Sequence, residues 1–391
     1  MKILFGTDLF YQNFAGSVSF IQYLAKGLIK DGHQVFVIAP SKTFENTISI
    51  EDGVTVYGIR SVIIPDVIYP SQFRIPITAG SNKIRTILEE VKPDVVSIQD
   101  HFMIGGKIAK ESRRLNIPTV GTNHFMPENF IHYLYPPEFA KEFLRKLAWK
   151  DFLRVYKKLD VVTTPTKTAA ELIKNLGLRN TIIPISNGVD LKRFNPKNNG
   201  QTLRTKYNIP PTEPIILFVG RLDKEKEIDE LIKAFAETLH KIRSKLIIAG
   251  KGTERSKLIS LSRKLGLSKD IIFPGFVPHV DLPSLYATAD VFAIASIAEL
   301  QSIATLEAMA SGLPVVAVNA IALPELVHDG ENGYLFEKGD TKNLSDKLVK
   351  ILKDKNLRKK MSKKSLEIIK QHNIEDTVKK YEKIYEKLVK S

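Results

Sequence analysis

Short apolar runs alternate with longer amphipathic stretches along most of the chain. Lys2 to Gly6 is the first run, a helical pattern from Val18 to Lys30 follows, and Gln34 to Ala39 is the next run. Further apolar runs occur at 54–59, 95–98, 119–121, 160–164 and 181–185. Short apolar runs separated by helical patterns are typical of strands buried in a parallel sheet. The pattern therefore predicts an α/β chain built from βαβ units.

The same alternation resumes after a polar stretch near the middle of the chain. Residues 196–212 are rich in Pro, Asn, Gly and Thr, which predicts a linker. Apolar runs then recur at 215–219, 245–249, 271–273, 291–295, 314–318 and 333–336, and helical patterns at 340–353, 357–370 and 374–390. We expect a first domain over residues 1–196, a second over 197–370, and a final helical segment over 371–391.

Composition narrows the class of protein. A chain of 391 residues with 43% hydrophobic and 26% charged residues is typical of a soluble protein with two cores. The chain has no cysteine, which excludes disulfides and thiolate catalysis. The start becomes polar too soon for a signal peptide, and no apolar run approaches the roughly 20 residues of a membrane span. We expect a cytoplasmic protein.

The net charge of +15 favours anionic partners, namely phosphorylated substrates, acidic lipid surfaces or nucleic acid. Much of the excess is lysine near the C-terminus, a pattern that a solvated helix face also produces. Residues 138–159 form a basic helical segment with a wide apolar stripe that includes Phe139, Phe143, Leu147 and Phe152. Such a helix can lie at a membrane interface, and a helix packed on its own sheet gives the same pattern.

Residues 298–318 combine a polar loop, a helix and a buried strand. Ser302 is a credible N-cap for a helix that ends before Gly312, and a helix N-terminus is a natural seat for a phosphate. Glu299 precedes this end, and Glu307 lies about 8 Å along the axis from Ser302 at about 1.5 Å per residue. Two carboxylates could thus flank an extended ligand with a phosphate between them. An ordinary surface helix gives the same spacing.

Charged and polar side chains follow several predicted strands. The buried run 215–219 is followed by Gly220, Arg221 and Lys226. The two cations suit a diphosphate, although a salt-bridged surface loop would have the same sequence pattern. We expect Lys224, between them, to be solvated. His101 and His124 each follow a predicted parallel strand, at the edge where ligands bind in open α/β sheets.

The chain resembles the retaining glycosyltransferases of family 4. Glu299 and Glu307, followed by Ala-Met-Ala-Ser-Gly-Leu-Pro-Val-Val, resemble the Glu-x7-Glu signature of that family. Gly-Arg-Leu-x-x-Glu-Lys at 220–226 resembles its diphosphate motif, and Asn-Gly-Val-Asp at 187–190 its interdomain segment. The resemblance implies the GT-B fold, with two facing Rossmann-like domains and mostly parallel sheets. It also implies an acceptor on the first domain, a nucleotide sugar on the second, and a last helix that crosses back to the first domain.

The resemblance assigns expected roles to individual residues. It implies a catalytic set of His124, Glu299, Arg221 and Lys226, in which Glu299 contacts the donor sugar, Arg221 and Lys226 stabilise the diphosphate, and His124 lies near sugar and acceptor. The implied donor-binding set adds Gly16, Asn187, Gly220, Ser302 and Glu307, the last contacting the nucleotide ribose. No metal site and no cofactor are expected. Where family members carry glycine, this chain has Glu227 after Lys226, and Asn-Ala-Ile-Ala at 319–322.

Residues 130–134 and Gln301 also look like those of family members that glycosylate diacylglycerol. The expected reaction is therefore transfer of a hexose, with UDP-glucose as the expected donor, to a membrane lipid by a peripheral enzyme at the inner face of the plasma membrane. Two alternatives stay open: the same reaction on a soluble acceptor, and a non-catalytic protein that binds polyanions. Nucleic acid is not an expected partner, and the sequence does not indicate an oligomeric state.

Overall fold

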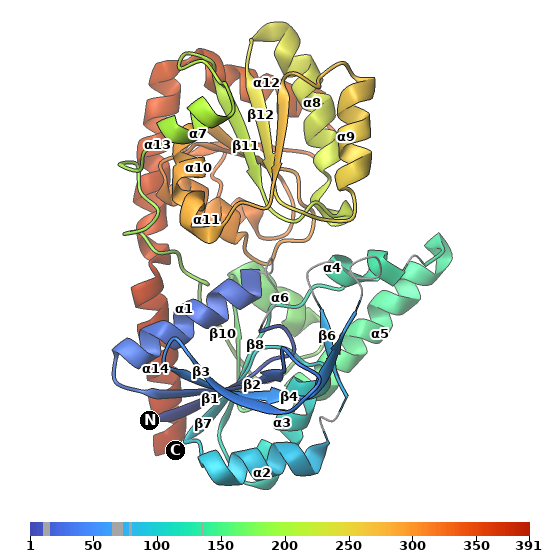
Figure 1. Ribbon diagram of the computed structural model, residues 1–391, viewed down its shortest axis with the longest axis vertical. Coiled ribbons are helices and arrows are strands. Elements are labelled where there is room, and N and C mark those ends of the chain that lie inside the picture. The colour runs from blue at the N-terminus through green and yellow to red at the C-terminus, as the bar shows by residue number, and fades with distance from the viewer. Residues whose placement is uncertain (11–15, 65–72, 78–79, 135) are drawn as a thin grey trace. The chain divides into compact units, whose positions relative to one another are not determined.

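The computed structural model describes residues 1–10, 16–64, 73–77, 80–134 and 136–391 (Figure 1). The chain forms two compact units, Met1–Asn187 with Ile374–Ser391, and Gly188–Asn373. Unit 2 thus begins at Gly188, ahead of the expected linker. The physical reason is that Val189 and Phe194 are buried in the core of unit 2, and that the Val189 N–H donates to the His372 carbonyl at 2.8 Å.

Unit 1 contains a sheet of eight strands in the order β10-β9-β8-β7-β1-β2-β4-β3. The strands of this sheet are β1 (Lys2–Gly6), β2 (Gln34–Pro40), β3 (Thr47–Glu51), β4 (Val54–Ile59), β7 (Val95–Ile98), β8 (Thr119–Thr122), β9 (Val161–Thr164) and β10 (Thr181–Pro184). A separate two-stranded antiparallel sheet consists of β5 (Ser61–Ile63) and β6 (Arg74–Pro76). The helices of unit 1 are α1 (Gly16–Lys30), α2 (Ser81–Val91), α3 (Met103–Arg114), α4 (Glu128–Ile131), η1 (His132–Leu134), α5 (Glu138–Tyr156), α6 (Lys167–Asn175) and α14 (Ile374–Lys390). All neighbours in the eight-stranded sheet are parallel except β3, which pairs antiparallel with β4.

The last helix, α14, is part of unit 1. Tyr381 and Tyr385 are fully buried in the core that also contains Phe5 of the central strand β1. The Tyr385 hydroxyl donates to Ser97 Oγ, on β7, at 2.9 Å. A buried tyrosine normally needs such a partner for its hydroxyl, and this bond fixes α14 against the middle of the sheet.

Unit 2 contains a six-stranded sheet, all parallel, in the order β13-β12-β11-β14-β15-β16. Its strands are β11 (Ile215–Val219), β12 (Lys245–Ala249), β13 (Ile271–Gly275), β14 (Val291–Ile294), β15 (Val315–Val318) and β16 (Gly333–Phe336). Its helices are α7 (Gln201–Lys206), η2 (Lys224–Lys226), α8 (Ile228–Lys241), α9 (Arg255–Lys264), η3 (His279–Asp281), α10 (Leu282–Thr288), α11 (Ile303–Ala310), η4 (Leu323–Glu325), α12 (Thr341–Lys353), α13 (Lys355–Ile368) and η5 (Ile369–His372). The expected linker over 196–212 is therefore partly helical.

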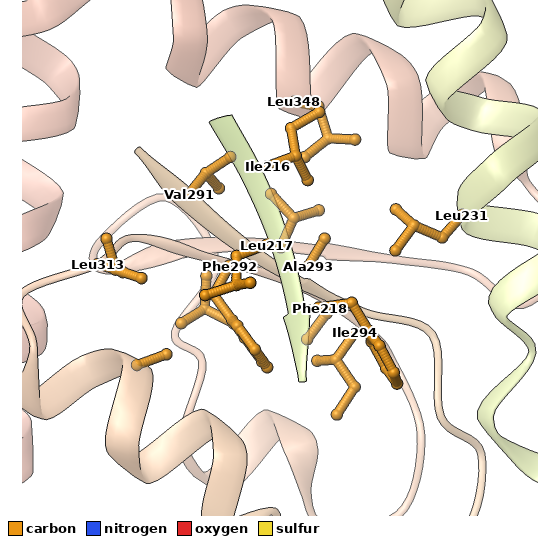
Figure 2. Packing of buried hydrophobic residues seen from close by; sticks show 14 of the residues in the cluster. Ile216, Leu217, Phe218, Leu231, Val291, Phe292, Ala293, Ile294, Leu313 and Leu348 are labelled. Atoms are coloured by element: carbon orange, nitrogen blue, oxygen red, sulfur yellow. The ribbon is translucent and has the colours of Figure 1, made fainter. Parts of the chain in front are cut away.

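The core of unit 2 is centred on β11, whose residues Ile216, Leu217 and Phe218 are all buried (Figure 2). Leu231 of α8 and Leu348 of α12 belong to the same cluster. A parallel strand covered on both faces has no polar side, which explains why the sequence reads as a continuous apolar run there. The α/β fold with mostly parallel sheets is thus confirmed for both units. Among the described residues, no helix is long and apolar enough to cross a membrane.

Candidate functional site

Arg221 lies two residues after the end of β11 and is oriented by two carboxylates. Its Nη1 donates to Asp223 Oδ2 at 2.7 Å and its Nη2 to Glu225 Oε1 at 2.6 Å. Asp223 Oδ1 in turn accepts bonds from the backbone N–H and the hydroxyl of Thr253, at 3.0 and 3.1 Å. Both carboxylates are buried. The guanidinium is therefore held in one orientation at the carboxyl edge of the sheet, where ligands bind in open α/β sheets.

Lys226 and Glu299, 73 positions apart in the sequence, form an ion pair. Lys226 Nζ lies 2.7 Å from Glu299 Oε1, and the two side chains are only 11% and 15% exposed. The Glu225 carbonyl accepts the N–H of Ile297 at 3.1 Å, which joins the loop after β11 to the loop after β14. Arg221, Lys226 and the Glu299 carboxylate thus share one edge of unit 2, whereas Lys224 is exposed, as predicted.

Glycines allow the loops after β11 and β12 to approach each other. A Cβ on Gly250 (φ +143°) would lie 1.8 Å from the Gly220 carbonyl oxygen, and one on Gly252 would lie 2.4 Å from the Leu222 carbonyl group. A Cβ on Gly220 would meet only the ring of Phe218, at 3.1 Å. The close approach at this edge therefore depends on Gly250 and Gly252 more than on Gly220.

The start of α11, at Ile303, lies four residues after Glu299. As predicted, Ser302 caps the helix: its hydroxyl oxygen accepts the N–H of Thr305 at 3.2 Å and the Thr305 hydroxyl at 2.9 Å. Gly312, just past the end, has φ +81°, which favours glycine. The partial positive charge of the helix N-terminus adds to the cationic character of this edge.

Glu307 is buried inside α11 and has a perturbed pKa. The Tyr286 hydroxyl, from α10, donates to Glu307 Oε2 at 2.8 Å. Burial raises the pKa of Glu307 to about 7, and the Tyr286 hydrogen bond and the positive charge of Arg193 oppose this rise only in part. Near neutral pH this carboxyl therefore exchanges between a neutral form and a carboxylate that accepts hydrogen bonds from hydroxyls.

Two residues have a left-handed backbone conformation, with positive φ, at positions where the family resemblance implies glycine. Glu227 has φ +47° and Ile321 has φ +49°. Glu227 follows Lys226 directly, and Ile321 lies in the loop after β15. Non-glycine residues adopt this conformation at a cost, which is greatest for β-branched side chains such as isoleucine. The loops thus keep a glycine-like backbone without glycine.

In unit 1, His124 follows β8 and belongs to a hydrogen-bond chain. Its Nε2 lies 3.2 Å from Gln99 Oε1, and the Gln99 amide donates to Ser97 Oγ at 2.9 Å, the atom that also accepts from Tyr385. Burial lowers the pKa of His124 to about 3, so its imidazole is neutral at pH 7. With Gln99 as acceptor, Nε2 carries the proton and Nδ1 can accept a hydrogen bond.

His101 has a different environment. It is 2% exposed, its ring lies 4.4 Å from those of Phe102 and Phe125, and burial lowers its pKa to about 4. These contacts indicate a structural histidine. Gly16 is the exposed first residue of α1, and Phe20 on the same helix lies 5.0 Å from the His124 ring.

The structure divides the predicted site residues between the units. Gly220, Arg221, Lys226, Glu299, Ser302 and Glu307 all belong to unit 2, whereas Gly16, His124 and Asn187 belong to unit 1. Sequence reasoning missed the residues that orient them. Asp223 and Glu225 stand beside Arg221 in the same motif and could have been found by their spacing. Tyr286 and Gln99 carry no local signal, because only the fold brings them to their partners.

Two family models match the chain. "Glycosyl transferases group 1" matches residues 199–386 and "Glycosyltransferase Family 4" matches residues 14–193. Alpha-monoglucosyldiacylglycerol synthases from Streptococcus pneumoniae and Acholeplasma laidlawii are 27% and 28% identical, over 86% and 87% of this chain and 75% and 86% of theirs. A GDP-mannose-dependent alpha-mannosyltransferase of Corynebacterium glutamicum is 27% identical over 88% of this chain and 78% of its own. The solved sucrose-phosphate synthase of Thermosynechococcus elongatus has a similar fold, with a TM-score of 0.81, 19% identity and 99% of each chain covered.

Proposed function

Because the chain belongs to the glycosyltransferases of family 4 and has their GT-B fold, we propose that it transfers a hexose from a sugar nucleotide to a diacylglycerol-type membrane lipid. The observation that carries this proposal is the cluster of Arg221, Lys226 and Glu299 at the carboxyl edge of β11 and the start of α11. It offers two cations for a diphosphate and a carboxylate for the hydroxyls of the attached sugar, all on unit 2.

The diphosphate would bind to Arg221 and Lys226, which now hold carboxylates. In the reaction the bond from the sugar carbon to the diphosphate breaks, and the acceptor hydroxyl oxygen bonds to the same carbon with retention of configuration. The acceptor proton leaves with the diphosphate, whose growing negative charge the two cations stabilise. We propose no metal, no cofactor and no covalent nucleophile for this step.

The two glutamates would recognise the two ends of the donor. Glu299 lies beside Lys226 and would accept bonds from hexose hydroxyls. Glu307, further along α11, would accept bonds from the ribose hydroxyls in its ionised form, with Tyr286 holding one of its oxygens. Gly220 and Ser302 would border the phosphates through their backbone, and Gly16 and Asn187 complete the proposed donor-binding set.

The acceptor would bind to unit 1, where the neutral His124 holds an acceptor or sugar hydroxyl through Nδ1. Two observations support a lipid: the two relatives called alpha-monoglucosyldiacylglycerol synthase, and the net charge of +15, which favours an anionic membrane surface. Because those two relatives are named for a glucosyl product, we propose UDP-glucose as the donor. We propose the inner face of the plasma membrane as the place of action, because its anionic lipids would attract a basic protein.

The test is transfer of radiolabelled glucose from UDP-glucose to diacylglycerol in anionic liposomes, with liposomes lacking diacylglycerol as control. GDP-mannose is assayed in parallel, and proton NMR of the product reports the anomeric configuration. Diacylglycerol-dependent incorporation into an α-linked product is expected. Incorporation only into a soluble acceptor, or an inverted product, would contradict the proposal. Failure to bind any sugar nucleotide would favour the non-catalytic polyanion-binding alternative.

A further inference from the structure

The N-terminal half of α5 carries an apolar ridge that the described part of the chain leaves uncovered. Phe139, Phe143 and Leu147 are 88%, 68% and 51% exposed. Their spacing of four residues places them on one face of the helix. Leu134, just before the helix, is 66% exposed. Single exposed apolar residues are ordinary, but a contiguous row with two phenylalanines indicates an interaction site.

The C-terminal half of the same helix is firmly anchored in unit 1. Trp149, Phe152 and Tyr156 are buried, and the Trp149 ring lies 5.4 Å from that of Phe125. Arg145 Nε lies 2.9 Å from Glu128 Oε1, which ties the middle of α5 to α4. In Figure 1, α5 extends outward past the end of the sheet of unit 1. The apolar stripe that the sequence indicates thus has two parts, one buried in unit 1 and one exposed on the outward-extending half of the helix.

We propose that the ridge of Phe139, Phe143 and Leu147 inserts into the interfacial layer of an anionic phospholipid bilayer and holds unit 1 on the membrane. Aromatic and leucine side chains on one helix face and cations beside them are the features of helices that lie in a membrane interface. The proposal deepens the proposed function, because such a surface would supply a lipid acceptor.

Charge favours a bilayer over a second copy of the chain. Lys146 and Lys150 are exposed on the same helix, and the Lys146 side chain is 75% exposed. Lys141 and Arg145 are paired with neighbouring glutamates, so they add less to the surface charge. Anionic lipid headgroups attract exposed cations, at roughly 1 kcal/mol for each lysine or arginine near the surface. Two copies that met at this ridge would bring together two pairs of exposed lysines on chains of net charge +15 each, which repel.

The ridge and the candidate acceptor residue belong to one connection in the chain. His124 follows β8, and α4, η1 and α5 succeed it before β9 begins. Phe125, the neighbour of His124, contacts Trp149 of α5. Lipid bound at the ridge would therefore lie on the helix whose buried half packs against Phe125, the neighbour of His124.

The chain offers a matched control on β3. Ile48 and Ile50 are 67% and 76% exposed, so they present a similar apolar pair on the same unit. Their surroundings lack an excess of cations, since Glu45 and Asp52 are close in sequence and the nearby Lys42 is paired with Glu51. A bilayer of anionic lipids should favour α5 and not β3, although both surfaces are apolar.

The experiment is flotation of the full chain with vesicles of phosphatidylglycerol and phosphatidylcholine that contain no diacylglycerol, without sugar nucleotide. For the wild type we expect vesicle binding that weakens with salt. The triple variant F139S/F143S/L147S should bind at least about tenfold more weakly, and I48S/I50S within about twofold of the wild type. K146Q/K150Q should weaken binding to the anionic vesicles and reduce its salt dependence.

The proposal is overturned if the wild type fails to float, if the triple variant floats like the wild type, or if I48S/I50S loses binding equally. It is also overturned if light scattering shows that the wild type is a dimer and the triple variant a monomer.

Transfer to a short-chain diacylglycerol in detergent micelles separates this proposal from the proposed function. If the chain binds vesicles but transfers no glucose, the proposed function is refuted and the proposed membrane-binding ridge stands. If it transfers glucose but does not bind vesicles, the ridge proposal is refuted and the proposed function stands.

Discussion

The buried carboxyl of Glu307 makes sugar-nucleotide binding depend on pH in a way that can be worked out beforehand. Its pKa is raised to about 7 by burial, and its Oε2 already accepts the Tyr286 hydroxyl. If the ionised form binds the ribose hydroxyls, protonation of Glu307 competes with the donor. With a pKa of about 7, about one tenth of the protein is ionised at pH 6 and about nine tenths at pH 8. The dissociation constant should therefore fall about tenfold from pH 6 to pH 8, which is about 1.4 kcal/mol.

The assay is isothermal titration of UDP-glucose into the wild type and Glu307→Gln at pH 6, 7 and 8. UDP-glucose suits the test because each of its phosphates is linked both to a sugar and to the other phosphate, so neither takes up a proton in this range. A glutamine can still accept the Tyr286 hydroxyl, so the variant should fold. It should bind independently of pH and, at pH 8, about five- to tenfold more weakly, since bonds to a charged acceptor are the stronger ones. Wild type and variant should converge near pH 6.

The refuting result is a Glu307→Gln variant that keeps the pH dependence of the wild type. In that case another group titrates, and Glu307 does not contact the ribose. The histidines His101 and His124 are poor candidates for such a group, because burial lowers their pKa values to about 4 and about 3. A flat profile in the wild type would equally contradict the role of the carboxylate.

Three further predictions concern the backbone and the support of the site. Ile321→Gly should raise the free energy of unfolding by up to about 1 kcal/mol in urea titrations, because it relieves the φ of +49° of a β-branched residue; Ala322→Gly, at φ −103°, should lower it, and the opposite order would refute the strain. Gly250→Ala should cost several kcal/mol and weaken donor binding, because its Cβ would lie 1.8 Å from the Gly220 carbonyl oxygen, whereas Gly220→Ala should cost about 1 kcal/mol or less. Tyr385→Phe should lower the free energy of unfolding by about 1 kcal/mol, because the hydroxyl bond to Ser97 is lost. It should also lower the glucose transfer rate more than the affinity for UDP-glucose. Equal stability of the variant and the wild type in thermal unfolding would show that this bond contributes nothing.

The sequence carries enough information for most of the parallel strands, since most of them are buried apolar runs; β10 and β13 are apolar runs that stay partly exposed. It also indicates α11 with its cap at Ser302, where local chemistry decides the helix start. It does not indicate β3, because Ile48 and Ile50 alternate with polar residues yet face outward on an antiparallel edge. Nor does it show that residues 201–206 are helical within a polar stretch.

The candidate site was predictable as a set of residues and not as a set of contacts. The motif around Arg221 is local, but the Lys226–Glu299 pair joins two loops 73 positions apart. The pKa of Glu307 depends on its burial and on Tyr286 of a different helix. The periodicity of residues 138–159 indicates one wide apolar stripe, whereas tertiary packing covers Trp149 and Phe152 and leaves Phe139 and Phe143 exposed.

The central claim is that Arg221 and Lys226 of unit 2 stabilise a departing diphosphate. One comparison of lysine variants tests it most directly. Glucose transfer to diacylglycerol liposomes is measured at saturating UDP-glucose for the wild type, Lys226→Ala and Lys224→Ala. Lys226 is buried beside Glu299, and Lys224, two positions away, is exposed. We predict that Lys226→Ala lowers the rate by about 10² to 10³, as expected for loss of one group that stabilises transition-state charge, while Lys224→Ala stays within about twofold. Equal rates in the two variants would contradict the account.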